Sequence, residues 1–293
     1  MKTFVLTGIA GFVGSGLAKT LVQSGHRVVG IKRRLSDTGR LNGIHKHITL
    51  YDVEGLNFES VLRELAPVEA IVHAATCYGR RHEGFSEILA SNTVFPLHLL
   101  EAATCSNDFG RFVNIDTVLE GSTNAYALSK KQFLAWGKYL SQVKGTSFIN
   151  VRMEHIFGPL DNKNSFASQI IRSCLTGCPV DLTLGEQRRD FIYIDDAVEA
   201  LRLLVEPCRR LREGFIEVSC GSGESISIRA FVETIHKMTN SRSILRFGVM
   251  PYRKEEVMES KADVTFLKEL GWRGATKLEE GIARTIESER RHF

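Results

Sequence analysis

Thr7-Gly8-Ile9-Ala10-Gly11-Phe12-Val13-Gly14 is the stretch that decides the fold, because it directly follows an apolar strand pattern at 3–7 and opens a helical pattern at about 11–24. Gly8 allows a tight turn, Gly11 lets the backbone approach a pyrophosphate, and Gly14 permits close packing of helix on strand. The helix amino terminus adds partial positive charge. A glycine triplet alone is weak evidence, since turns use glycine for geometry alone. Between a strand and a helix, it predicts a dinucleotide site.

Short apolar or β-branched runs alternate with amphipathic helical patterns along the first half of the chain. Strands are expected at 3–7, 27–31, 47–51, 70–73, 111–115 and 147–151, and helices at about 11–24, 58–65, 92–105 and 126–143. Alternation of this kind predicts the α/β class, with a Rossmann-type, doubly wound parallel sheet that is covered by helices on both faces.

The rhythm changes after Gly158-Pro159, where a helix at 164–176, a short strand near 180–184 and a helix at 195–206 are followed by mixed short elements. We therefore expect a dinucleotide-binding domain over residues 1–157. A smaller, mainly substrate-binding C-terminal domain is expected over residues 158–293, with some of its segments returning to the first domain.

Composition excludes several classes of protein. The chain has 293 residues, 43% of them hydrophobic, which suffices for a full core. Its net charge is +4, and its densest basic run is three residues long, too short for a nucleic-acid tail. The six cysteines lack a zinc spacing, so no metal is expected. Without a membrane-helix run or a signal-peptide core, we expect a cytoplasmic protein with no membrane or nucleic-acid partner.

The second predicted strand ends in the basic run Lys32-Arg33-Arg34. In chains that prefer NAD, an acidic residue usually binds the 2′-hydroxyl of the adenosine ribose at this point. The three cations suit a 2′-phosphate instead and offer no acceptor for a free hydroxyl. The run therefore favours NADP(H) as the cofactor; the alternative is a solvated basic turn.

A tyrosine and a lysine lie four residues apart in Tyr126-Ala127-Leu128-Ser129-Lys130, at the start of a helical pattern. This spacing places both side chains on one helix face. A lysine ammonium near a phenol lowers the phenol pKa from ~10 toward neutral pH, as proton exchange with a carbonyl oxygen requires. The preceding strand ends in Asp116-Thr117, which offers a hydroxyl to hold the substrate oxygen. Tyr-x-x-x-Lys is common by chance, and this position gives it weight.

Together, the three segments resemble the extended short-chain dehydrogenase/reductase family, the NAD-dependent epimerase/dehydratase group. Further matches are Val72-His73-Ala74-Ala75, Asn92 in the following helix, and the run from Arg152 to Gly158-Pro159. The stretch 185–196 resembles the family signature in the sugar-nucleotide region, and 262–281 resembles the C-terminal end. The resemblance therefore covers nearly the whole chain.

The resemblance implies a role for individual residues. Thr117 would hold the substrate oxygen, Tyr126 would exchange a proton with it, and Lys130 would activate the tyrosine and contact the nicotinamide ribose. With the turn and the basic run, the expected cofactor residues are Gly8, Ile9, Gly11, Phe12, Val13, Gly14, Lys32, Arg33, Arg34, Asp52, Val53, Ala74, Ala75, Asn92, Tyr126, Lys130 and His155. The expected substrate residues are Thr76, Thr117, Asn164, Arg189 and Arg253. For the two arginines, the alternative is an ion pair with an acid such as Asp190 or Glu255.

Departures from the family pattern narrow the reaction. Family 4,6-dehydratases carry Asp-Glu directly after the threonine, and the epimerase-reductases that make GDP-fucose carry a cysteine two residues beyond it. This chain has Val118 and Leu119, which exchange no protons. Simple hydride transfer remains, and we expect NADPH-dependent reduction of the 4-keto group of a nucleotide-activated deoxyhexose.

Three strings narrow the resemblance to a branch of the family: Asn150 to Pro159 with its Glu154-His155 pair, Thr76-Cys77-Tyr78-Gly79, and Asn114-Ile115-Asp116-Thr117. They resemble the CDP-abequose synthases and related 3,6-dideoxyhexose 4-reductases, which serve surface-polysaccharide synthesis such as that of the lipopolysaccharide O-antigen. His155 would lie near the nicotinamide or the sugar, or else be a core histidine. Asp116 would tune the site, or else cap the following turn.

Two other functions stay open on the same scaffold. One is a nucleotide-sugar 4-epimerase with tightly bound NAD, and the other is a non-catalytic nucleotide sensor. Such sensors typically lose the tyrosine or the lysine, which this chain keeps. The resemblance also implies a homodimer whose four-helix interface is built from the helices around 92–105 and 126–143.

Overall fold

A computed structural model of the chain describes residues 1–106, 108–208, 211, 214–254 and 256–291, and these form two compact units. The first unit is Met1–Met153, Val198–Val218 and Glu269–Trp272. The second unit is Glu154–Ala197, Ser219–Lys268 and Arg273–Phe293. The boundary after Met153 lies four residues before the expected one at 157, and two later segments return to the first unit.

A seven-stranded sheet with the order β10-β6-β5-β4-β1-β2-β3 forms the centre of the first unit. Neighbours from β1 to β6 run parallel, and the strand order reverses at β1 and β4, which is the switch point where such sheets bind ligands. The parallel, doubly wound sheet is confirmed. Its strands are β1 (Thr3–Thr7), β2 (Arg27–Lys32), β3 (Ile48–Asp52), β4 (Val68–His73), β5 (Phe109–Thr117), β6 (Phe148–Met153) and β10 (Phe215–Cys220), the last of which was not predicted.

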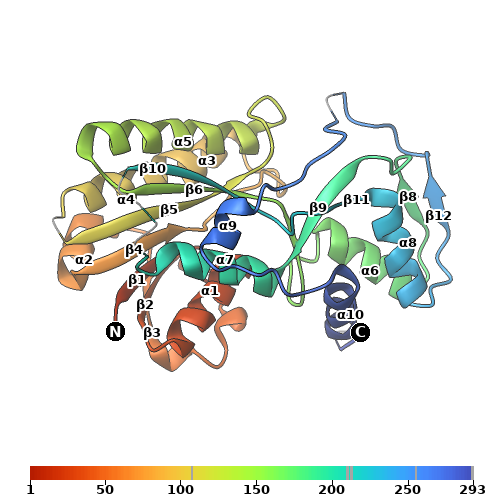
Figure 1. The fold of residues 1–293 in the computed structure, drawn as a ribbon, viewed down its shortest axis with the longest axis horizontal. Helices are drawn as coiled ribbons and strands as arrows, with labels where there is room; N and C mark the ends of the chain where they lie inside the picture. Colours follow the sequence, from red (N-terminus) through yellow and green to blue (C-terminus); the bar gives the residue numbers. More distant parts are fainter. Residues whose placement is uncertain (107, 209–210, 212–213, 255, 292–293) are drawn as a thin grey trace. The chain divides into compact units, whose positions relative to one another are not determined.

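Helices cover both faces of this sheet (Figure 1). One face carries α1 (Phe12–Gln23) and the returning part of α7 (Ile194–Val205), which meet where Gly16 contacts Val198. The other face carries α2 (Phe58–Leu65), α4 (Phe95–Thr104) and α5 (Ala125–Lys144). Before α4 lie α3 (Phe85–Leu89) and a π-helical turn at Ala90–Val94, so the helix expected at 92–105 begins earlier. Two short 3-10 turns, Gly39–Leu41 and His45–His47, precede β3.

Aromatic rings hold α5 against the sheet. Phe133 on α5 packs edge-on against Phe112 on β5 and Phe148 on β6, with ring centroids 5.8 Å apart in both pairs. A Cβ on Gly137 would lie 2.2 Å from the Phe148 ring, so glycine alone allows this closeness. The close packing fixes the start of α5 beside the end of β5, which is where the expected catalytic residues lie.

The second unit is built on small sheets and three longer helices. Its strands are β7 (His155–Phe157), β9 (Arg188–Tyr193) and β11 (Ser225–Ser227) in the order β11-β9-β7, and β8 (Val180–Leu182) paired with β12 (Leu245–Phe247). Its helices are α6 (Phe166–Thr176), α8 (Ile228–Met238), the short α9 (Thr265–Glu269) and α10 (Leu278–Arg290). Phe191 on β9 stacks on Phe231 on α8 at 3.8 Å in its core. Within the described parts of the chain, no helix is long and apolar enough to cross a membrane.

Candidate active site

The turn after β1 has the geometry of a pyrophosphate cradle. Gly8 adopts φ +64°, and a Cβ there would lie 2.6 Å from the Ala75 backbone nitrogen. A Cβ on Gly14 would lie 2.3 Å from the Gly8 oxygen, so the start of α1 packs closely on the turn. Gly11 is exposed and offers no capping side chain, and the first turn of α1 carries no acidic residue. The first amides of α1 therefore fit an anion.

The other expected cofactor residues around this turn differ in the exposure of their side chains. The Ile9 side chain is buried under Gly30, where a Cβ would lie 2.5 Å from it, so only the Ile9 backbone faces the turn. Phe12 and Val13 are partly exposed. Ala75 follows Ala74 after β4, and its N–H donates to the Thr7 hydroxyl at 3.2 Å. These positions border the cradle as expected; cofactor contact stays a prediction.

The basic run at the end of β2 is only partly neutralised. Lys32 Nζ pairs with Asp52 Oδ1 at 2.5 Å, which joins two of the expected cofactor residues to each other. Arg33 and Arg34 are exposed, and no ion pair of either is found among the described residues. The Val53 side chain packs against the core of the α2–α4–α5 face. Arg33 and Arg34 are therefore the cations available to a 2′-phosphate.

Thr117, Tyr126 and Lys130 come together where β5 ends and α5 begins. Asn124 caps α5, since its Oδ1 accepts from the Ala127 N–H at 2.9 Å. The Thr117 hydroxyl accepts from the Leu119 N–H at 3.2 Å, and Thr117 lies close enough to Tyr126 to affect the pKa of that phenol. Lys130 is fully buried, and its Nζ has no hydrogen-bond partner in the described structure. An unpartnered buried ammonium fits the ribose hydroxyls of a nicotinamide nucleotide.

The electrostatics of this group differ from the expectation in one respect. Burial, reinforced by the nearby Tyr78 and Asp116, raises the pKa of Tyr126, so the expected lowering by Lys130 does not occur in this structure. Burial also lowers the pKa of Lys130 to about 8, against the opposing charge of Asp116. The expectation was wrong because spacing predicts proximity and not desolvation. The consequence is a phenol that stays protonated at neutral pH in this structure.

Two residues of the loop after β4 adjoin Tyr126, and neither was assigned a role from the sequence. The Tyr78 ring lies 5.0 Å from the Tyr126 ring, and the Arg80 guanidinium lies 5.0 Å above Tyr78. Thr76, an expected substrate residue, is partly exposed in the same loop. Tyr78 and Arg80 follow the carboxyl end of β4, and ligands of parallel sheets bind at that edge. This position in the sequence is the signal that could have identified them.

Asn92 lies inside the π-helical turn and is fully buried. Its Nδ2 donates to the Cys77 carbonyl at 2.8 Å and to the Ser129 hydroxyl at 3.0 Å, and its Oδ1 accepts from the Cys77 N–H at 2.8 Å. The amide therefore ties the loop after β4 to α5. This positions the loop; direct contact of Asn92 with a cofactor stays a prediction.

His155 lies on β7 in the second unit and is not a core histidine, since 38% of its side chain is exposed. Its Nδ1 lies 3.5 Å from Glu154 Oε2, and its ring lies 5.7 Å from that of Phe191. Glu154 is buried and accepts a hydrogen bond from the Ser260 hydroxyl at 2.7 Å. His155 Nδ1 has no hydrogen-bond partner in the described structure, so its place near the nicotinamide or the sugar stays a prediction.

The two expected anion-binding arginines differ. Arg189 is buried and pairs with Glu256 at 2.5 Å, so the ion-pair alternative holds for it, with Glu256 as the partner. Asp190 instead accepts backbone N–H bonds from Ser222 at 2.7 Å and from Ala262 at 3.1 Å.

Arg253 is exposed, and no ion pair of it is found among the described residues, which do not include Glu255. Asn164 is exposed just before α6, and its N–H donates to Asn162 Oδ1 at 2.9 Å. Arg253 is therefore the better candidate of the two arginines for a diphosphate, and the roles of Arg253 and Asn164 stay predictions.

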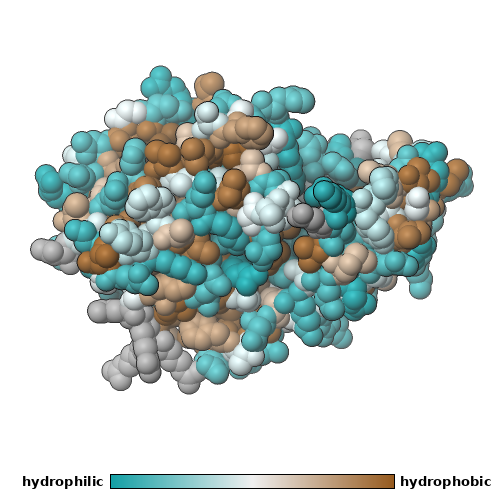
Figure 2. Space-filling view, turned by 90° about the horizontal axis from the view of Figure 1, so that it is seen from above, coloured by the Kyte–Doolittle hydropathy of each residue, from teal (hydrophilic) through white to brown (hydrophobic). Residues whose placement is uncertain are grey.

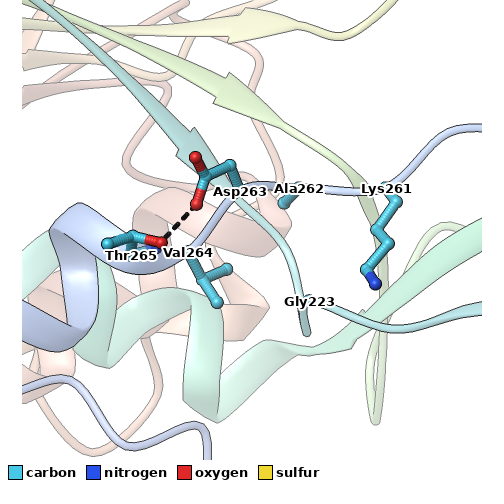
Figure 3. A pocket seen from close by; sticks show the side chains of 6 residues that line it. All are labelled: Gly223, Lys261, Ala262, Asp263, Val264 and Thr265. Atoms are coloured by element: carbon cyan, nitrogen blue, oxygen red, sulfur yellow. Dashed lines mark hydrogen bonds between the residues drawn. The ribbon is translucent and has the colours of Figure 1, made fainter.

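A hollow of about 370 Å³ in the second unit is lined by Gly223 and the run from Lys261 to Thr265 (Figure 3). Its one carboxylate, Asp263, accepts from the Thr265 N–H at 3.0 Å and so holds the start of α9. No predicted site residue lines it, and we assign it no part in catalysis.

Comparison with known proteins identifies the family. The model of the NAD dependent epimerase/dehydratase family matches residues 4–218. A CDP-abequose synthase of Salmonella muenchen is 31% identical, with 97% of each chain covered, and a probable UDP-glucuronate 4-epimerase of Rhizobium meliloti is 29% identical, with 97% of this chain and 96% of the relative covered. The structure of MoeE5 with UDP-glucuronic acid and NAD has a TM-score of 0.83 at 27% identity, covering 99% of this chain and 100% of the other. The chain therefore belongs to the NAD dependent epimerase/dehydratase family.

Proposed function

We propose that the protein is a cytoplasmic, NADPH-dependent reductase of the 4-keto group of a nucleotide-activated deoxyhexose. CDP-4-keto-3,6-dideoxyglucose is the favoured substrate, and CDP-abequose or a similar sugar nucleotide is the product, made for surface polysaccharide. Full-length similarity to a CDP-abequose synthase supports the substrate class. Family membership and the NAD in the MoeE5 structure support an enzyme that binds a nicotinamide cofactor and acts on a nucleotide sugar.

The observation that carries the proposal is the group of Thr117, Tyr126 and Lys130 with apolar neighbours at Val118 and Leu119. A single protonated phenol is enough for reduction, whereas dehydration and epimerisation beside a ketone need a second acid–base group. Burial keeps the Tyr126 pKa high, which favours proton donation over proton abstraction. The same three residues argue against a sensor without catalysis.

The reaction balances with the residues present. When bound, the reduced cofactor supplies hydride to the C4 carbonyl carbon. Tyr126 donates its hydroxyl proton to the C4 oxygen, so the ketone becomes a secondary alcohol, and the phenolate regains a proton from solvent. Thr117 holds the C4 oxygen in reach of that proton. The Lys130 ammonium binds the ribose and stabilises the phenolate as it forms.

Two sets of cations support the choice of ligands. Arg33 and Arg34 carry the proposal of NADP(H), since the Lys32 charge is already balanced by Asp52. Arg253 is proposed to bind the nucleotide diphosphate. Arg189 is proposed to support diphosphate binding only indirectly, because its guanidinium is paired with Glu256.

One other function has specific support. A 4-epimerase with tightly bound NAD is favoured by the similarity to the Rhizobium meliloti protein and by the NAD of the MoeE5 structure. The two functions differ in cofactor use, because an epimerase regenerates its NAD within each turnover. Net oxidation of NADPH therefore separates them.

The test is the loss of NADPH absorbance when purified protein meets CDP-4-keto-3,6-dideoxyglucose, with NADH and dTDP-4-keto-6-deoxyglucose as comparisons. We expect oxidation of NADPH with the CDP sugar. Tyr126→Phe should lose a factor of about 10²–10⁴ in rate while still binding NADPH, and Tyr139→Phe, at an exposed tyrosine of the same helix, should not. Oxidation with neither ketone would contradict the proposal and favour the epimerase.

A further inference from the structure

A buried ion pair lies directly behind the catalytic group and has no part in the mechanism above. Asp116, the last residue but one of β5, has a fully buried side chain, and its Oδ2 lies 2.8 Å from Lys131 Nζ. Lys131 is the residue after Lys130 on α5 and is mostly buried. A buried ion pair is weak evidence for stability, since apolar residues of similar volume often serve equally well. Its geometry points to another role.

Both backbone groups of Thr117 are held by this pair. The Thr117 N–H donates to Asp116 Oδ1 at 2.7 Å, and the Thr117 carbonyl accepts from Lys131 Nζ at 2.8 Å. Thr117, which adjoins Tyr126, is therefore held at the backbone groups on both sides of its Cα. Because Lys131 belongs to the helix that carries Tyr126 and Lys130, the same pair joins the two elements that supply the catalytic group.

The pair is itself embedded in the sheet. Asn150 on β6 donates from Nδ2 to Asp116 Oδ2 at 3.1 Å, and its Oδ1 accepts from Asn114 Nδ2 at 2.8 Å. Asn150 Nδ2 also reaches Glu217 on β10 at 3.2 Å. Asp116 is thus held by donors from α5 and β6, so its carboxylate has a fixed position.

The charges of Asp116 and Lys131 act on Lys130 in opposite directions. The Asp116 carboxylate raises the pKa of Lys130 and the Lys131 ammonium lowers it, while burial has the largest effect. The other titratable groups of the surroundings are Tyr126, with Tyr78 and Arg80 around its ring, and the fully buried His73 of β4, whose pKa is held well below its usual value by burial and by Lys130. His73 therefore stays neutral, and Asp116 and Lys131 dominate the local charge.

We propose that Asp116 and Lys131 are positioning residues for the proton transfer: together they fix Thr117 against Tyr126 and set the charge balance around Lys130. We call them the Asp116–Lys131 clamp. The proposal rests on the proposed reductase function for its kinetic consequence only, because the arrangement of charges acts on Lys130 whether or not the sugar is the right one.

The clamp has a signature that a merely structural role lacks, since its two members shift Lys130 in opposite directions. Asp116→Asn removes the anion and should lower the pKa of Lys130. Lys131→Met removes a repelling cation and should raise it. Reduction needs Lys130 protonated, so the basic limb of the kcat/KM profile should move down in pH for Asp116→Asn and up for Lys131→Met, each by at least about half a unit.

The double variant and the conservative variant complete the design. Asp116→Asn with Lys131→Met leaves no uncompensated buried charge, so it should fold even where Lys131→Met does not. Its basic limb should lie between those of the single variants, while kcat falls about tenfold or more because Thr117 is no longer held. Lys131→Arg keeps the pair and should stay within about threefold of the unaltered protein. Lys144→Met, at an exposed lysine of the same helix, is the matched control.

The experiment measures two quantities in parallel: the kcat/KM profile for NADPH oxidation, and the pKa of Lys130 in the cofactor-free protein by NMR of its ε-methylene, assigned with Lys130→Arg. Opposite shifts of the NMR pKa in the two single variants support the clamp, and they do so even without turnover, in which case only the proposed function fails. Identical NMR pKa values in Asp116→Asn, the double variant and the unaltered protein would overturn it, whatever the rates.

Discussion

At the scale of single residues, the burial of the Lys130 ammonium lowers the stability of the folded protein. Its ammonium is fully buried, and no partner for it is found in the described residues. Burial lowers its pKa from 10.5 to about 8, so the folded protein binds this proton less tightly than the unfolded chain does. Between those two values the unfolded state holds more protons, and stability therefore rises with pH. Below pH 8 the full cost remains.

Lys130→Met should accordingly stabilise the cofactor-free protein while it abolishes reduction. The gain in free energy of unfolding should be about 2–3 kcal/mol at pH 7, and it should shrink as pH rises from about 8 toward 10. Urea unfolding at pH 7.0 and pH 9.5 checks both statements, with Lys144→Met as the exposed control. An equal difference at the two pH values would show that the buried charge is not the cause.

Arg33 and Arg34 offer a second test at this scale. Changing both to Ser should weaken NADPH binding about 10- to 100-fold, because charge-assisted hydrogen bonds to a 2′-phosphate are lost. Binding of NADH, which lacks that phosphate, should change less than about threefold. Fluorescence titration at fixed salt measures both constants, and Lys46→Ser provides an exposed cation of the first unit for comparison. An equal loss for the two cofactors would argue for a solvated turn.

What the sequence predicts of the site follows from distance along the chain. Two predictions rest on local patterns: the spacing of Tyr126 and Lys130, and the glycines of the first turn. The structure has both residues on α5 and a tight turn at the glycines, as these patterns predict. The contact of Asp116 with Lys131 and that of Arg189 with Glu256 join segments that only tertiary packing brings together. Desolvation also depends on that packing, so the direction of the Tyr126 pKa was missed.

At the scale of elements, regular alternation made six strands of the first unit visible in the sequence, and two features of that unit were not. In the second unit, β9, α8 and α10 were not predicted either. β10 is as long as β6, but its residues alternate only weakly between buried and exposed positions, and it lies beside β6 although the two are far apart in the chain. The helix before α4 begins at Phe85, behind Gly84, whose N–H donates to Glu87 at 2.8 Å. The sequence predicted a helix from about 92, which lies inside the π-helical turn that joins α3 to α4.

The contact of α5 with β6 makes a prediction for Gly137. Alanine normally favours a helix over glycine by about 1 kcal/mol, but here its Cβ would lie 2.2 Å from the Phe148 ring. Gly137→Ala should therefore destabilise the protein by about 1–3 kcal/mol, because α5 or the ring must shift. Gly121→Ala is the control, since its Cβ would make only ordinary contacts, the nearest at 3.6 Å. Thermal unfolding that ranks Gly137→Ala at or above the unaltered protein would contradict this packing.

At the scale of the whole molecule, the two compact units interleave along the chain, because 198–218 and 269–272 return to the first unit. Returning segments were expected, but no local pattern marks where they lie, so the sequence did not predict which residues return. The consequence is that a cut at residue 157 would remove part of α7, which covers one face of the first unit's sheet, and also β10. Experiments on the proposed reaction therefore call for the full chain.

The first unit also exposes an apolar stripe along α5, made of Leu128, Trp136, Tyr139 and Val143, each 47–54% exposed. Their spacing puts them on one helix face. Phe85 on the adjoining α3 is 82% exposed. Figure 2 views the molecule from the side of α5 and shows hydrophobic residues gathered on this face. Exposed apolar patches of this kind mark interfaces between proteins, which agrees with the homodimer that the resemblance implies.

Trp136→Lys tests this interface, because a two-fold dimer would place two lysines into the apolar contact at once. Loss of a central tryptophan typically costs about 2–4 kcal/mol, so the dissociation constant should rise about 30- to 1000-fold. Sedimentation velocity over a range of concentrations should give a dimer for the unaltered protein and a monomer for Trp136→Lys, each with unchanged circular dichroism. Lys46→Glu, before the edge strand β3 that lies farthest from β6 in the sheet order, should leave the dimer intact. An unaltered protein that sediments as a monomer at tens of micromolar would contradict the dimer, and the stripe would then need another partner.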